Sequence, residues 1–289
     1  MISVIISSYQ PEYFTALEKN IAETVGVPYE IIKIDNPGLM GICKAYNTGA
    51  QLAKFDNLLF IHEDILFHTQ NWGEKLISHL QDPETGIIGV AGSDYVPVAP
   101  SGWFINNDQH QFLHLIQNNK KGNEPKYYNQ SSHPRQRVYA LDGVFLGINK
   151  LKFNDISFNE DLQGFHAYDL DISLNAATKY NNYVINDILI EHFSIGSPDK
   201  SWLEGVSIVR KIYGSSFQEK SSSKIELDCF ENYLFAYFKA YHITAKNMLI
   251  TLNFLPFSRT TIKEIFYIAK LYYRYFKYKN YYKTKFYSI

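Results

Sequence analysis

The sequence predicts an α/β protein with a Rossmann-like, mixed and mostly parallel sheet flanked by helices, followed by a C-terminal helical appendage. Across residues 1–91, short apolar runs alternate with segments whose apolar residues recur at helical spacing. This alternation is typical of βαβ units and a parallel sheet. Beyond residue 220 the pattern is helical throughout and rich in aromatic residues.

The elements of residues 1–91 follow in regular order. Four short apolar runs predict buried strands at 2–6, 30–34, 57–61 and 86–91. Helical spacing predicts three helices between them at 11–25, 41–54 and 72–80. Pro11 suits the first turn of its helix, where a backbone N–H has no partner to lose. Small residues in the second helix predict close packing.

The remaining elements are less regular. Residues 92–137 are rich in Asn, Gln, Pro, His and Gly, which predicts a long functional loop with one helical patch at 112–116. Strands are then predicted at 138–148 and 183–195, and helices at 164–180 and 201–213. A serine-containing linker at 220–224 predicts an α/β domain at 1–219 and a helical appendage at 220–289, with helices at 227–255 and 260–287.

Composition narrows the functional classes. The chain has 289 residues and a formal net charge of −1, so nothing global indicates a nucleic-acid partner. Its two cysteines, Cys43 and Cys229, are far apart and predict reduced thiols. No apolar stretch has the length of a membrane span or the form of a signal peptide. We therefore expect a cytoplasmic protein, soluble or peripheral at the inner face of the membrane.

Polar residues follow the predicted parallel strands. In open parallel sheets, ligands bind beyond the carboxyl ends of the strands. This rule selects seven residues before any family is considered: Ser7, Ser8, Tyr9, Asp35, His62, Glu63 and Asp64. The carboxylates cost desolvation free energy unless a cation meets them, and Mg²⁺ or Mn²⁺ bridging a diphosphate would do so. The alternative is an ordinary polar turn.

Four further acidic or imidazole residues stand out. Asp142 precedes Gly143 inside an apolar run, where a carboxylate needs a partner. Asp169 and Asp171 lie near a predicted helix start, where they could simply complement the helix dipole. His192 comes late in a predicted strand, where the alternative is a core histidine.

These segments, in this order, resemble the family 2 nucleotide-sugar glycosyltransferases of the GT-A fold. The similarity covers about residues 1–215 and is closest to the bacterial branch whose metal motif begins with His. The resemblance implies that Asp64 and His192 bind Mn²⁺ or Mg²⁺. It implies a donor site made by Ser7, Ser8, Tyr9, Asp35, Asn36, Gly41, Lys44, Asn47, His62, Glu63, Asp142 and Gly143.

The resemblance also implies a reaction. Asp169 matches the general base, and Asp171 could share that role because Tyr168 stands where the family has Glu. A sugar would pass from a nucleoside diphosphate to a glycan or lipid-linked acceptor, by inverting displacement. One alternative is nucleotidyl transfer, although residues 7–12 lack the Gly and basic residues of a triphosphate loop. Another is an inactive GT-A-like domain that binds a glycan or a partner.

The C-terminus carries a separate pattern. Residues 259–289 hold eight Lys or Arg and one acid, Glu264, and so net +7, which leaves −8 for residues 1–258. On one helical face lie Lys263, Lys270, Arg274 and Lys277. The other face is predicted to hold Ile262, Ile265, Phe266, Ala269, Tyr272 and Phe276. This pattern is typical of a helix at an anionic membrane surface; packing on the α/β domain and a homodimer contact are the alternatives.

Overall fold

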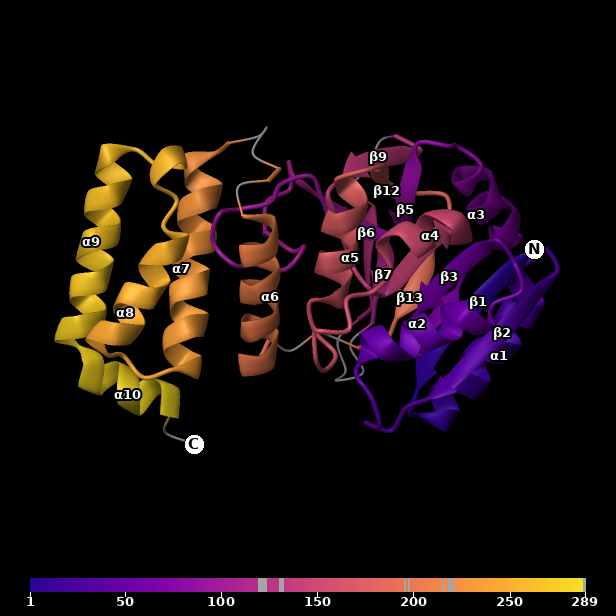
Figure 1. Cartoon of the computed structure of the whole chain (residues 1–289), viewed down its shortest axis with the longest axis horizontal. Helices are drawn as coiled ribbons and strands as arrows, with labels where there is room; N and C mark the ends of the chain where they lie inside the picture. The colour runs from indigo at the N-terminus through magenta and orange to yellow at the C-terminus, as the bar shows by residue number, and fades with distance from the viewer. Residues whose placement is uncertain are drawn as a thin grey trace. The chain divides into compact units, whose positions relative to one another are not determined.

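The computed structural model of the chain (Figure 1) describes residues 1–118, 124–129, 133–194, 196, 198–214, 216–217 and 221–287. The chain forms two compact units. The α/β unit comprises Met1–Tyr95 and Asn106–Ser197, and the helical unit comprises Val96–Ile105 and Pro198–Ile289. The domain boundary predicted between residues 219 and 220 falls within the helical unit. It stays a prediction.

The α/β unit is built on a seven-stranded sheet. Its strand order is β2 (Tyr29–Asp35), β1 (Ile2–Ser8), β3 (Asn57–Ile61), β11 (Phe145–Asn149), β5 (Thr85–Gly89), β12 (Asn181–Ile185) and β9 (Arg135–Val138). β1 pairs in parallel with β2 and β3, and β5 pairs in parallel with β12. β11 is antiparallel to both β3 and β5, so five strands share one direction. The predicted mixed, mostly parallel sheet is confirmed.

A second sheet lies in the same unit. Its order is β10 (Ala140–Leu141), β6 (Ala91–Ser93), β7 (Gln111–Gln117), β13 (Ile190–His192) and β4 (Ile65–Phe67), and β8 (Lys126–Asn129) pairs with β7. The predicted helical patch at 112–116 is therefore wrong. Those residues form β7, because hydrogen bonding to β6 and β13 decides the conformation of a short apolar run that periodicity leaves ambiguous.

Two predicted strands are divided between the sheets. The run at 138–148 is broken at Asp142, whose N–H donates to the Ala91 carbonyl and whose carboxylate accepts from the Val144 N–H. β10 before this turn belongs to the small sheet and β11 after it to the large one. The run at 183–195 divides in the same way into β12 and β13. Asp142 thus lies in a turn between strands rather than within one.

Among its described residues, the α/β unit has five helices: α1 (Pro11–Thr24), α2 (Ile42–Leu52), α3 (Trp72–Leu80), α4 (Lys150–Ile156) and α5 (Tyr168–Ala177). α2 packs closely on β1, since a Cβ on Gly49 would lie 2.3 Å from a methyl group of Ile5. This contact explains the small residues in that helix. The helix α4 and the strand β4 were not expected from the sequence.

The helical unit contains α6 (Lys200–Tyr213), α7 (Ser223–Ala240), α8 (Ala245–Thr251), the 3-10 turns Leu252–Phe254 and Phe257–Arg259, α9 (Ile262–Lys277) and α10 (Lys279–Tyr287). The single helix predicted at 227–255 is broken after α7, where Tyr241 is extended and Thr244 caps α8. No helix among the described residues is long and apolar enough to cross a membrane.

A buried ion pair holds this unit together. Arg259 Nη1 lies 2.6 Å from Glu226 Oε1, and the two side chains are 3 % and 0 % exposed. Glu226 also accepts from the Val98 N–H, and Arg259 donates to the Val96 carbonyl. Because both charged side chains are buried, these bonds offset the cost of removing the charges from water. They fasten Val96–Ile105 to helices far along the chain.

Candidate donor and metal site

The strand register gathers the predicted site at one edge of the sheet. Ser8 pairs with Asp35, and Ile6 pairs with Ile61, so β1, β2 and β3 end together. His192, at the end of β13, pairs with Ile65 of β4. The Phe193 N–H donates to the Asp64 carbonyl. The chain after β3 and the end of β13 are therefore joined by backbone hydrogen bonds.

This joining brings His62, Asp64 and His192 together. Their ligand atoms all lie within 4.8 Å of one another. Nε2 of His192 is 3.6 Å from Asp64 Oδ1, and Nδ1 of His62 is 4.0 Å from the same oxygen. Two ligands that each lie about 2.1 Å from one ion can be at most about 4.2 Å apart, so both separations suit a shared cation. Sequence reasoning placed His62 with the donor; its position beside Asp64 makes it a third candidate ligand.

Tyr168 fixes the orientation of His62. Its hydroxyl oxygen lies 2.8 Å from His62 Nε2, on the side of the ring away from Asp64. If Nδ1 binds a cation, Nε2 carries the proton and donates it to this hydroxyl. Such a second partner is what ligating histidines usually have. Tyr168 begins α5, and Tyr46 packs edge-on against its ring with the centroids 5.8 Å apart.

Gly143 makes room for Tyr168. A Cβ on Gly143 would lie 2.0 Å from the Tyr168 hydroxyl, so no other residue fits here without moving the ring. The Gly143 N–H donates to Asp169 Oδ2 at 3.1 Å, and the Leu170 N–H donates to Asp169 Oδ1. Gly143 was predicted to face the donor, and in the structure it contacts both Tyr168 and Asp169.

The two candidate bases differ in exposure. Asp169 is half-buried, whereas Asp171 is 3 % exposed. Burial raises the pKa of Asp169, against the lowering effect of the Leu170 and Gly143 N–H groups. Burial lowers the pKa of His62 to about 4 and lowers that of His192, which keeps both rings in the neutral form that can bind a cation.

Glu63 points back into the protein. Its carboxylate accepts from the backbone N–H groups of Tyr9 and Gln10 at 3.0–3.2 Å, and the residue is 4 % exposed. It therefore fixes the loop between β1 and α1. Ser8, the last residue of β1, is buried, and Tyr9 in the loop is 63 % exposed. Glu63 shapes the site through this loop, which the sequence alone did not reveal.

The second loop of the site is ordered by Asn36. Its side chain donates to Ser7 Oγ and to the Met40 carbonyl and accepts from the Met40 N–H. Asn36 is 1 % exposed, whereas the Asp35 side chain is 77 % exposed and forms an ion pair with Lys33. Asn36 thus organises the loop that leads to α2, and Asp35 is accessible to a ligand.

The predicted donor residues of α2 take different positions. Asn47 bonds to the backbone of Phe158 in both directions and to Glu160. Gly41 lies against the Gly164 backbone, where a Cβ would meet its oxygen at 3.2 Å. Lys44 is exposed. Asn47 and Gly41 therefore hold α2 to residues 158–164.

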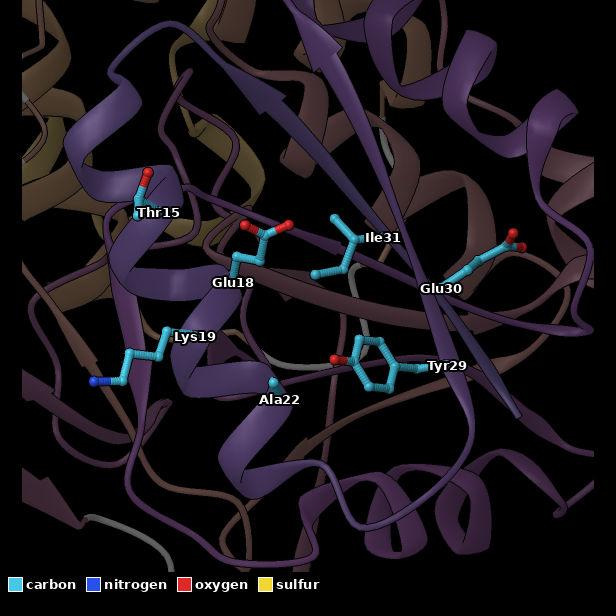
Figure 2. A pocket seen from close by; sticks show the side chains of 7 residues that line it. All are labelled: Thr15, Glu18, Lys19, Ala22, Tyr29, Glu30 and Ile31. Atoms are coloured by element: carbon cyan, nitrogen blue, oxygen red, sulfur yellow. The ribbon is translucent and has the colours of Figure 1, made fainter.

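A surface depression elsewhere on the α/β unit contains none of these residues. It lies between α1 and β2 and is lined by Thr15, Glu18, Lys19, Ala22, Tyr29, Glu30 and Ile31 (Figure 2). Figure 2 shows Tyr29 and Ile31 on the side of β2 toward α1. The Glu30 carboxylate is already bonded to Ser3 and to the Lys54 N–H. The depression is therefore separate from the site at the strand ends.

The sheet has the architecture of the GT-A glycosyltransferase fold. Residues 3–215 match the model of the glycosyltransferase-like family, and the chain belongs to that family. The match has nearly the extent that the sequence resemblance implied.

Solved structures of similar fold agree with this class. A GalNAc-T7 structure with UDP, GalNAc and Mn²⁺ is 10 % identical with a TM-score of 0.55; the alignment covers 96 % of this chain and 58 % of that one. TarS residues 1–349 from S. aureus in complex with UDP are 15 % identical with a TM-score of 0.52, covering 88 % and 78 %. The UDP-GlcNAc complex of TarS is 14 % identical with a TM-score of 0.52. A comparison with curated proteins found no match.

Proposed function

We propose that this protein transfers a sugar from a nucleoside-diphosphate donor to a hydroxyl group of a glycan or lipid-linked acceptor. The observation that carries the proposal is the group formed by His62, Asp64 and His192 at the carboxyl end of a GT-A sheet. This is the edge of an open α/β sheet where ligands bind. GalNAc-T7 and TarS, which have a similar fold, bind UDP, so a uridine nucleotide is the donor to test first.

The three candidate metal ligands, His62, Asp64 and His192, suit Mn²⁺ better than Mg²⁺. Mg²⁺ prefers carboxylate and water oxygens, whereas two of these three candidate ligands are imidazoles, which favour transition metals. The GalNAc-T7 structure of similar fold contains Mn²⁺. When bound, the ion would stabilise the negative charge of the departing diphosphate as a Lewis acid.

The chain's own residues would perform the remaining tasks. Glu63 and Asn36 hold the loops after β1 and β2, which would receive the nucleoside. Asp169 is the more accessible carboxylate and would accept the proton of the acceptor hydroxyl. The acceptor oxygen would attack the anomeric carbon as the bond between that carbon and the diphosphate oxygen breaks. One base and one displacement would invert that carbon.

The proposal is tested with a panel of nucleoside diphosphates in thermal-shift assays, with and without Mn²⁺. A ligand that binds only the folded state raises its stability by mass action. We expect one nucleoside diphosphate, with UDP the first to be tested, to raise the melting temperature only when Mn²⁺ is present. We also expect the protein to release that diphosphate slowly from its sugar conjugate. Binding without any release would indicate a non-catalytic protein, and pyrophosphate release from a nucleoside triphosphate would indicate nucleotidyl transfer.

A further inference from the structure

Helix α9 carries two separate apolar stripes, and one of them forms the core of the helical unit. Ile268, Leu271 and Tyr275 are buried, and Tyr275 contacts Phe238 of α7 with ring centroids 4.8 Å apart. The Tyr272 hydroxyl lies 2.6 Å from Thr251 Oγ1. The sequence predicted one apolar face that included Tyr272. In the structure Tyr272 belongs instead with this buried stripe.

The second stripe faces outward. It consists of Ile262, Phe266, Ala269, Tyr273 and Phe276, which recur at intervals of four, three, four and three residues and so align along one side of the helix. The four large side chains are 74 %, 66 %, 60 % and 53 % exposed, in chain order. We call these five residues the outward stripe. Its large side chains are mostly exposed and lie outside the buried stripe.

Cations border the outward stripe along its length. They are Lys263, Lys270, Arg274 and Lys277, all exposed. The Nζ of Lys277 is 5.6 Å from the Tyr273 ring centroid, and that of Lys279 is 5.6 Å from the Phe276 ring centroid. The acid on α9, Glu264, is occupied in capping the helix at Thr261.

The charge on this surface decides between a membrane and a second copy of the chain. Four exposed cations border the outward stripe and Glu264 caps its own helix, so two copies meeting by this face would place like charges together. An anionic lipid surface complements the charge. Phe and Tyr rings suit the depth of the headgroups, and Lys stems can cross apolar surface while their ammonium groups stay in water.

We propose that the outward stripe and its bordering cations dock this protein on an anionic membrane surface. Ile262, Phe266, Tyr273 and Phe276 insert among the lipid headgroups, and the lysines contact the lipid phosphates. The proposal goes beyond glycosyl transfer and does not depend on it, because membrane binding is measured without substrate.

The test is sedimentation of the full chain with vesicles of phosphatidylcholine, with and without phosphatidylglycerol. We expect binding to the anionic vesicles only, weakening as salt screens the charges. A triple variant replaces Lys263, Lys270 and Lys277 with Gln. We expect its affinity for anionic vesicles to fall about fivefold per charge, and so about 100-fold in total. The matched control neutralises Lys19, Lys54 and Lys211, which are exposed elsewhere, and keeps most of the affinity.

A second pair of variants tests the apolar contact. Phe266→Ser with Phe276→Ser weakens vesicle binding at least about tenfold, whereas Leu151→Ser, at a 75 % exposed position of α4, does not. Thermal unfolding shows that all variants stay folded. The proposal is overturned if the full chain ignores anionic vesicles at low salt, or if stripe and control variants bind alike. It is also overturned if light scattering shows a dimer that the Phe266 and Phe276 changes dissociate.

Discussion

The hydroxyl of Tyr168 lies 2.8 Å from Nε2 of His62, so the residue that begins α5 sets the orientation of an imidazole that follows β3. The opposite ring nitrogen then faces Asp64. In the proposed enzyme, Tyr168 is a positioning residue that acts through His62. The same ring fills the space beside Gly143, whose N–H bonds to Asp169. One dipeptide, Tyr168-Asp169, thus connects the candidate metal ligand with the candidate base.

We predict that Tyr168→Phe weakens Mn²⁺ binding by about 10–100-fold, the usual effect of removing an outer partner of a metal-bound histidine. The change removes the hydroxyl and keeps the ring, so the packing is preserved. Mn²⁺ affinity is measured by electron paramagnetic resonance without nucleotide. Tyr180→Phe is the control, since its hydroxyl donates to Asp155 Oδ2, which is not a site residue. Equal affinities in the two variants would exclude Tyr168 from this role.

Gly143→Ala is expected to displace the Tyr168 ring, because the added Cβ would lie 2.0 Å from its hydroxyl. Overpacking of this kind costs about 1–3 kcal/mol of stability, and here we also expect weaker Mn²⁺ binding. Urea unfolding and metal titration measure the two effects. Gly196→Ala is the control, because no described residue beyond its chain neighbours lies within 4 Å of its added Cβ. If Gly143→Ala binds Mn²⁺ like the wild type, the position of Tyr168 does not control His62.

The exposure of the two aspartates predicts different roles. Asp169→Asn removes a proton acceptor and should lower the rate of sugar transfer by about 10²–10⁴-fold while donor binding persists. Asp171→Asn should mainly change stability, because Asp171 is 3 % exposed. Transfer rates and nucleotide affinities are measured for both variants. An inactive Asp171 variant beside an active Asp169 variant would reverse the assignment.

In the helical unit, Arg259→Met should lower the free energy of unfolding by about 3–5 kcal/mol, because Glu226 then loses the partner of a buried ion pair. The exposed pair of Lys200 and Glu204 provides a control. Lys200→Met should change stability by less than about 1 kcal/mol. Urea unfolding measures both. A small loss for Arg259→Met would show that other groups compensate for the charge of Glu226.

The sequence predicted the sheet well because strand periodicity and strand ends are local features. Asp64 was selected by its position after a strand and His192 by its position late in one. The role of Glu63 could not, since its bonds reach back to Tyr9 and Gln10 of a loop 53–54 residues earlier. The same holds for Tyr168, where the absence of Glu was visible but the contact with His62 was not.

The other departures from the predicted fold arise from tertiary contacts. The runs at 138–148 and 183–195 were each predicted as one strand, and pairing with different sheets divides them. Val96–Ile105 belongs with the helical unit because Glu226 and Arg259 bond to its backbone. Such partners lie more than 120 residues away along the chain. No local pattern in the sequence reveals a contact of that range.

The most direct test of the proposed metal-dependent donor site is calorimetric titration of UDP into the wild type and into Asp64→Asn, each with and without Mn²⁺. Asp64 Oδ1 lies within 4.0 Å of both histidines, and the side chain is 13 % exposed, so the isosteric change should leave the fold intact. We expect UDP binding to the wild type only with Mn²⁺, and no such binding in the variant. Equal Mn²⁺-dependent binding to both proteins would contradict a site built on His62, Asp64 and His192.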